Sequence, residues 1–130
     1  MKSMNKLLLA LSFLVGIVTA NYQTPWVAPK SADAISNPLK NDLTAIKKGK
    51  AIYVQFCAIC HGDKGKGDGL AGAALNPKPA SFITEKFLKQ TDGAIYWKLT
   101  EGRPPMAGYK ETLSETQRWQ LVNYLKSLKK

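Results

Sequence analysis

Apolar and small residues recur at helical spacing in the first part of the chain that shows clear periodicity. The three- and four-residue steps join Ile46, Gly49, Ile52, Tyr53 and Phe56. This pattern predicts a helix, because residues at those steps share one face. Asp42 and Thr44 are both suitable N-caps for it, since a short oxygen-bearing side chain can accept a bond from the first free amide groups.

The sequence predicts two further helices. A weaker helical pattern lies between the first helix and these two. One is predicted from Asp92 to Glu101, where Gly102 supplies a stop. The last begins at a capping box made by Ser114 and Gln117. It continues with an apolar stripe of Leu121, Val122, Leu125 and Leu128. Residues 85–90 could add a short fourth helix. Nothing alternates with the period of two expected of a strand, so the sequence predicts an all-α fold.

The first twenty residues have the pattern of a secretory signal peptide. Lys2 and Lys6 precede an apolar run over 7–18, and small residues lead up to Ala20. The run is shorter than the roughly 20 residues that span a bilayer. We therefore expect cleavage after about Ala20 and export to the periplasm. Retention of the segment as a membrane anchor is the alternative.

Residues 21–41 are predicted to form an extended N-terminal arm, because they carry three prolines and little periodicity. Trp26 and Val27 are the candidates for pinning this arm to the domain surface, and a disordered tail is the alternative. Residues 42–130 are then predicted to form one domain. Three or four short helices make a thin core, since ordering each residue costs about 1–2 kcal/mol of backbone entropy. A large apolar group is expected at its centre.

The composition excludes several kinds of functional site. The chain has 130 residues, of which 45% are hydrophobic and 22% charged, as in a folded globular protein. Its two cysteines are too few for a disulfide framework, and there is no second cysteine pair to complete a four-ligand zinc site. Its single histidine, His61, excludes histidine-rich metal centres.

Cys57, Cys60 and His61 form a C-x-x-C-H motif at the end of the first predicted helix. There the spacing places both sulfurs and the imidazole on one side, and the motif is the attachment signature of c-type haem. Two thiols bond the two vinyl groups as thioethers, and the adjacent histidine meets the iron. We therefore predict one covalently bound haem c. A thioredoxin-like redox pair would need a βαβ setting, which the sequence does not supply.

With this motif the sequence resembles the class I monohaem cytochromes c, of the exported bacterial kind. The segments 49–57 and 121–126 resemble the N- and C-terminal helices of that family, and the likeness covers about 44–130. The resemblance implies a small fold in which these two helices cross at a glycine. By this likeness, Gly49 lets the ring of Tyr124 approach, and Tyr53 packs against Leu121.

The stretch after the motif, 61–69, resembles the glycine-rich loop of bacterial members. Residues 67–72 also satisfy G-x-G-x-x-G, but a dinucleotide site needs a strand before the glycines and a helix after them. We interpret these glycines as permitting tight turns beside the porphyrin.

Met106 is the expected second axial ligand of the iron. Met1 and Met4 leave with the signal segment, so Met106 is the only methionine of the mature chain. The family likeness also places its axial methionine in a loop such as this one, between two helices. Many bacterial members have proline after the methionine, where this chain has Ala107. An ordinary loop methionine packed on apolar neighbours is the alternative.

Two other family features leave their residues open. A proline carbonyl usually accepts a hydrogen bond from the proximal histidine, and Pro77 and Pro79 are both candidates. Tyr96 or Trp97 could bond a haem propionate, or either could be an ordinary core aromatic.

The predicted function is one-electron transfer, without enzymatic catalysis, between periplasmic or membrane redox partners. With histidine and methionine on the iron, no position stays open for oxygen or peroxide chemistry, and the potential is raised. One alternative is a haem-bearing subunit docked on an oxidoreductase. Another is a haem enzyme or gas sensor in which Met106 does not bind.

The positive charge points to the partners. The net charge is +10, and it is still +8 without residues 1–20, which hold two lysines and no acids. We predict a monomer that meets redox partners through their acidic docking faces, because complementary charge speeds transient association. Nucleic acid is not expected, an anionic membrane surface remains open, and a merely solvated basic surface is the alternative.

Overall fold

The computed structural model describes residues 24–129, and the predicted signal peptide lies outside them. Within this range five α-helices and two 3₁₀ turns occur, with no strand, which confirms the all-α prediction. The α-helices are α1 (Leu43–Phe56), α2 (Ala58–His61), α3 (Glu85–Leu88), α4 (Asp92–Glu101) and α5 (Glu115–Ser127). The 3₁₀ turns are η1 (Lys30–Ala34) and η2 (Leu70–Gly72). No helix in the described range is long and apolar enough to cross a membrane.

The helix ends follow the local sequence. Asp42, rather than Thr44, caps α1, because its carboxylate accepts from the amides of Thr44 (2.8 Å) and Ala45 (3.1 Å). The predicted capping box at Ser114 and Gln117 is present, with both reciprocal bonds. The weak fourth pattern is the short helix α3, and α4 has the predicted bounds.

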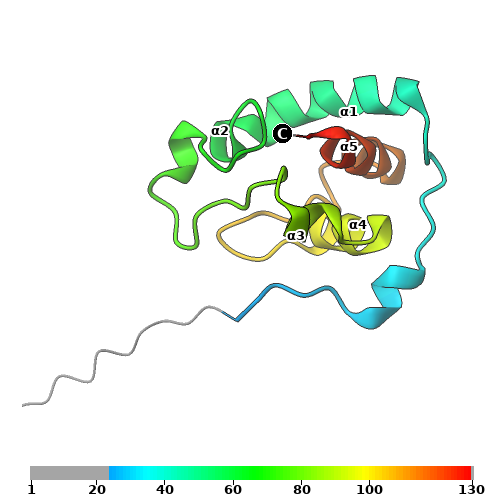
Figure 1. Ribbon diagram of the computed structural model, residues 1–130, viewed down its shortest axis with the longest axis horizontal. Helices are drawn as coiled ribbons and strands as arrows, with labels where there is room; N and C mark the ends of the chain where they lie inside the picture. The colour runs from blue at the N-terminus through cyan, green and yellow to red at the C-terminus, as the bar shows by residue number, and fades with distance from the viewer. Residues whose placement is uncertain (1–23, 130) are drawn as a thin grey trace, which may run out of the picture.

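α1 and α5 pack against each other on one side of the domain, with α3 and α4 beneath them (Figure 1). The two helices meet at Gly49, where a Cβ would lie 2.0 Å from the carbonyl oxygen of Gln120 and 2.9 Å from Cβ of Tyr124. The predicted crossing at this glycine is thus confirmed. The atoms closest to a Cβ at Gly49, however, belong to the α5 backbone at Gln120 and not to the Tyr124 ring. That ring packs on the ring of Tyr53, with 5.1 Å between centroids.

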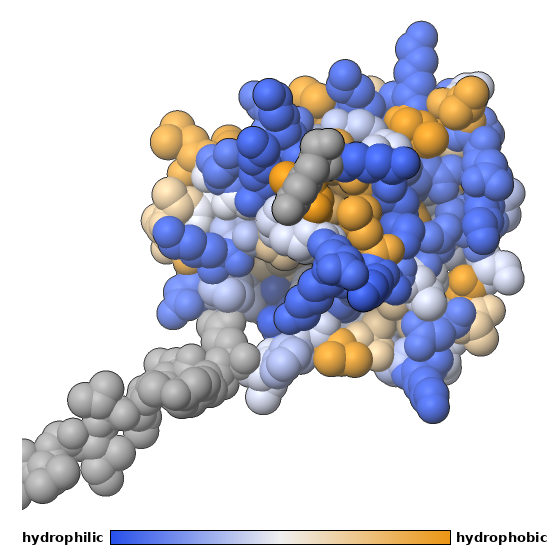
Figure 2. All heavy atoms as spheres, viewed as in Figure 1, coloured by the Kyte–Doolittle hydropathy of each residue, from blue (hydrophilic) through white to orange (hydrophobic). Residues whose placement is uncertain are grey.

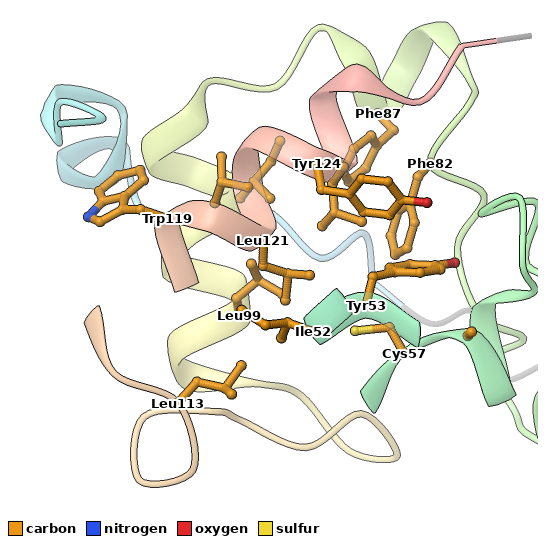
Figure 3. Packing of buried hydrophobic residues seen from close by; sticks show 14 residues of the cluster. Ile52, Tyr53, Cys57, Phe82, Phe87, Leu99, Leu113, Trp119, Leu121 and Tyr124 are labelled. Carbon is orange, nitrogen blue, oxygen red and sulfur yellow. The ribbon is translucent and has the colours of Figure 1, made fainter. Parts of the chain in front are cut away.

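The core is apolar and rich in aromatic side chains. Tyr53, Leu121 and Val122 are completely buried. Figure 3 shows Tyr53 next to the rings of Tyr124 and Phe82, with Cys57 close by. The first cysteine of the motif therefore belongs to the same cluster as the two crossing helices.

The described part of the predicted arm, residues 24–41, lies against the domain and includes η1 (Figure 1). Asn37 donates from Nδ2 to Asp92 (2.9 Å) and to Asn123 (2.7 Å), which links the arm to α4 and α5. Trp26 is half-buried, whereas Val27 is 75% exposed. Of the two predicted pinning residues, therefore, Trp26 contributes to the attachment and Val27 does not.

We predict that Gly49→Val lowers the free energy of unfolding by about 1–3 kcal/mol, because any Cβ there must displace the Gln120 carbonyl. Urea unfolding of the haem-loaded protein measures this free energy. Ala51→Val, at an exposed position of the same helix, is the control and carries only the small helix-propensity cost of valine. Equal stability of the two variants would mean that the helices do not need the glycine.

Candidate functional site

The motif cysteines and histidine occupy the junction of α1 and α2. Cys57 ends the first helix, since its amide donates to the Tyr53 carbonyl (2.8 Å), and it begins the second by accepting from the amide of His61 (2.8 Å). Cys60 and His61 therefore follow one turn after Cys57. Both cysteines are free thiols, so neither is committed to a disulfide.

Burial and one hydrogen bond fix the state of His61. Its Nδ1 lies 2.9 Å from the carbonyl oxygen of Ala80, which can only accept, so Nδ1 carries the proton. Burial lowers the pKa of His61, partly offset by the Ala80 bond, and favours the neutral ring. The ring also stacks on Phe82, with 4.3 Å between centroids. Nε2 is consequently the nitrogen with a free lone pair for a metal.

Ala80 is the acceptor that sequence reasoning missed. We expected the carbonyl of Pro77 or Pro79, and the structure instead uses the residue directly after Pro79. A backbone acceptor leaves no trace in side-chain identity, so only the proline-rich neighbourhood could have indicated the segment.

The glycine-rich loop wraps closely around the motif. The amide of Gly67 donates to the His61 carbonyl (2.8 Å), and that of Gly69 donates to the Cys60 carbonyl (3.1 Å). Gly67 has φ of +80°, and a Cβ there would lie 2.5 Å from the Pro79 carbonyl oxygen. No strand precedes this loop within residues 24–129, and the element directly after it is the short η2 rather than a long helix. The glycines thus serve tight turns, as predicted, rather than a dinucleotide.

Tyr53 ties the helix pair to the end of the motif. Its hydroxyl donates to the carbonyl of Gly62, directly after His61, at 2.5 Å. The phenol is completely buried, and burial raises its pKa well above the usual value. It therefore stays a neutral hydrogen-bond donor at physiological pH.

Met106 lies in the loop after α4 and packs, half-buried, against the core cluster that contains Cys57. Three residues later, the Tyr109 hydroxyl donates to the carbonyl of Phe56 (3.3 Å), at the end of α1. Burial raises the pKa of Tyr109, and Cys57 and Cys60 add to the shift. The methionine loop and the motif are thus brought to the same part of the molecule, with Tyr109 as a link that the sequence did not reveal.

Tyr96 pairs α4 with α5. Its ring stacks on Trp119 with 4.0 Å between centroids, and its hydroxyl accepts from Nη2 of Arg118 (2.9 Å). Arg118 is itself buried and donates from Nη1 to the Leu113 carbonyl (2.6 Å). These contacts show Tyr96 packing between α4 and α5, and its role toward a propionate stays a prediction. No hydrogen bond involves the ring nitrogen of Trp97 within the described range.

The Cys57 thiol is poorly suited to redox exchange. Burial, with a smaller contribution from Cys60, raises the pKa of the Cys57 thiol to about 12, whereas reactive C-x-x-C pairs have a lowered thiol pKa. Among residues 24–129, no three histidine, cysteine or acidic side chains gather as a metal site.

The residues present do fit a covalently attached haem. Two unpaired thiols lie one turn apart beside apolar side chains, which suits a large hydrophobic ring. His61 offers one nitrogen in a fixed tautomer, and Met106 supplies a soft thioether on a loop next to the same cluster. Nitrogen and sulfur together form a donor set that suits haem iron.

Comparisons with known proteins agree with this fit. The profile of the family described as cytochrome c oxidase, cbb3-type, subunit III matches residues 44–125. A thiosulfate dehydrogenase of Stutzerimonas stutzeri (strain A1501) is 32% identical over 85 residues, which are 63% of this chain and 27% of that protein. The chain thus spans about a quarter of this curated relative.

Two solved structures are also similar. One is the Kuenenia stuttgartiensis reducing HAO-like protein complex Kustc0457/Kustc0458, with 30% identity and a TM-score of 0.65 over 84% of this chain and 53% of that one. The other is the KustC0563 c-type cytochrome, with 28% identity and a TM-score of 0.52 over 63% of this chain and 98% of that one. The chain therefore belongs to the c-type cytochrome family described as cbb3-type oxidase subunit III, and its domain is that of an electron-transfer haem protein whose cofactor is covalently bound haem c with its iron.

Proposed function

We propose that the protein is a one-electron carrier in which Cys57 and Cys60 hold the haem as thioethers, and His61 and Met106 are the axial ligands of its iron. The observation that carries this proposal is the 2.9 Å bond from His61 Nδ1 to the Ala80 carbonyl. It leaves Nε2 for the iron, directly beside two free thiols. The bound haem supplies the Fe(III)/Fe(II) couple, with a potential raised by methionine ligation.

The surrounding residues hold these ligands still. His61 is fixed by a hydrogen bond at one edge and by Phe82 on its face. Cys57 is 7% exposed, so water has little access to that side of the site. A carrier benefits from such rigidity, because a ligand set that moves little between two charge states adds little reorganisation to the transfer. With both axial positions taken by side chains, the proposed site leaves no place for a substrate on the iron.

The exposed lysines support acidic redox partners. Only two ion pairs occur among residues 24–129, Lys89–Glu85 and Lys126–Asp92. The exposed lysines that flank the motif in the sequence therefore form no ion pair within that range; they are Lys47, Lys48, Lys50, Lys64, Lys66 and Lys78. Figure 2 shows hydrophilic side chains over much of the visible face, with apolar ones among them. Such a surface favours fast, salt-sensitive encounters.

A groove beside the motif is the candidate docking face. Lys64 and Lys66 line it together with Asp63 and Asp68. Three exposed apolar side chains also line it: Val54, Ile59 and Leu70. An apolar patch flanked by charges suits a brief contact, since the lysines steer the approach and the apolar groups exclude water on contact.

A haem-bearing subunit of a larger oxidoreductase is the second candidate. It is favoured by the two relatives, one a thiosulfate dehydrogenase and the other part of a HAO-like complex, of which this chain matches only part. Gel filtration of the native extract distinguishes the two, because a free carrier elutes as a small monomer and a subunit elutes with its enzyme. In either case the site is proposed to work in the periplasm after export.

We predict that the haem of the mature protein stays with the polypeptide after acid denaturation and organic extraction, because thioether bonds survive both. Cys57→Ala/Cys60→Ala should release any pigment it binds into the solvent. The Cys57→Ala variant, with one thioether left, is the matched control and should retain its colour. Extraction of the wild-type pigment would refute covalent attachment at these cysteines.

Met106→Ala should abolish the sulfur-to-iron charge-transfer absorption of the ferric protein and lower its reduction potential. The variant should also bind carbon monoxide and cyanide readily, because an axial position becomes free. Met106→His is the control: it loses the same band but keeps six-coordinate iron and a slow response to added ligands. An unchanged spectrum in Met106→Ala would assign the ligand role to another residue and reopen the enzyme and gas-sensor alternatives.

Electron transfer with the native partner should slow steeply as salt rises, since the Debye length falls to about 10 Å at 0.1 M. Lys64→Glu/Lys66→Glu should flatten that dependence if the groove faces the partner. Lys30→Glu/Lys40→Glu carries the same charge change on the arm and is the control. Stopped-flow rates at several ionic strengths measure the effect. Equal slopes for the two double variants would place the docking face elsewhere.

A further inference from the structure

Residues 24–26, in the arm, contact the loop that carries Met106. The guanidinium of Arg103 donates from Nη1 to the carbonyl of Thr24 (3.0 Å). Its Cζ lies 5.2 Å from the ring centroid of Trp26, within the range of a cation–π contact. A segment almost eighty residues earlier in the sequence therefore holds a side chain of the methionine loop.

Arg103 is also the backbone partner of Met106. The amide of Arg103 donates to the Met106 carbonyl (3.1 Å), and the amide of Met106 donates to the Arg103 carbonyl (2.9 Å). These two bonds close the short turn 103–106. Whatever fixes Arg103 therefore fixes the base of the turn that presents the Met106 side chain.

Trp26 makes a second contact of the same kind with α4. Nζ of Lys98 lies 5.6 Å from the centroid of the indole ring. Burial lowers the pKa of Lys98, and the nearby charge of Arg103 lowers it further, which places the two cations within electrostatic reach of each other. The electron-rich indole face and the Thr24 carbonyl offset this repulsion.

We propose that residues 24–26 act as a strap that positions the Met106 loop, with Trp26 as a positioning residue that works through Arg103. This inference rests on Met106 being an axial ligand of the iron, as proposed above. The strap acts on Arg103, at the base of the methionine turn. Its effect is to disfavour the opening of the turn 103–106, the movement that would let another ligand replace the methionine sulfur.

The test is imidazole binding to the ferric, haem-loaded protein, followed by loss of the sulfur-to-iron absorption. Trp26→Ala should increase the apparent affinity for imidazole about fivefold, the factor that corresponds to one partly exposed cation–π contact. Val27→Ala is the matched control, because Val27 is the next residue in the arm and its side chain is exposed. Trp26→Phe keeps an aromatic face and should restore most of the wild-type behaviour, and it also serves if the alanine variant folds poorly.

A double-mutant cycle shows whether the strap acts through Arg103. Arg103→Ala should raise the imidazole affinity as well, and Trp26→Ala/Arg103→Ala should add little to the larger single effect. The strap proposal is wrong if Trp26→Ala binds imidazole with the same affinity as Val27→Ala. It is also wrong if the effects of Trp26→Ala and Arg103→Ala on that affinity are additive in the double variant. Absence of the sulfur absorption in the wild-type protein would instead refute Met106 as ligand, so the two failures are distinguishable.

Discussion

The close crossing of α1 and α5 at Gly49 is the constraint on which the rest of the structure depends. It brings the α5 backbone at Gln120 to a distance that leaves no room for a Cβ. This approach buries Tyr53 against Tyr124, and the Tyr53 hydroxyl then reaches the carbonyl of Gly62. A contact between distant parts of the sequence is thus transmitted, through one phenol, to the residue that follows His61.

The two sides of the site are built differently. The side of His61 is determined by helices and by a buried aromatic cluster, in which Phe82 contacts both Tyr53 and the imidazole ring. The side of Met106 is a loop held by scattered bonds, one of them from Tyr109 to the end of α1. A loop held in this way is expected to open more easily than the helices do. We therefore expect the methionine side, more than the histidine side, to determine how firmly the proposed ligands are held.

The sequence was sufficient for the features that local chemistry determines. Helical periodicity, the Ser114 capping box and the C-x-x-C-H spacing each depend on side chains close together in the chain, and the structure contains the corresponding helices and junction. It was insufficient where a backbone group is the partner: the acceptor for His61 is Ala80 and not a proline. It also left Tyr96 undecided, because stacking on Trp119 depends on how two helices dock.

The arm shows how the fold limits the ways in which the protein can meet a partner. A tether to another subunit needs residues that are free to leave their own domain. Asn37 instead bonds side chains of α4 and α5, and Ala32 is 1% exposed. Releasing residues 24–41 would therefore expose buried groups and break hydrogen bonds that hold the domain together, a cost that a partner would have to offset. Recognition by the domain surface carries no such cost, because its lysines are already exposed and largely free of carboxylate partners within the described range. The contacts that attach residues 24–41 to the domain therefore disfavour any partner that would have to capture the arm.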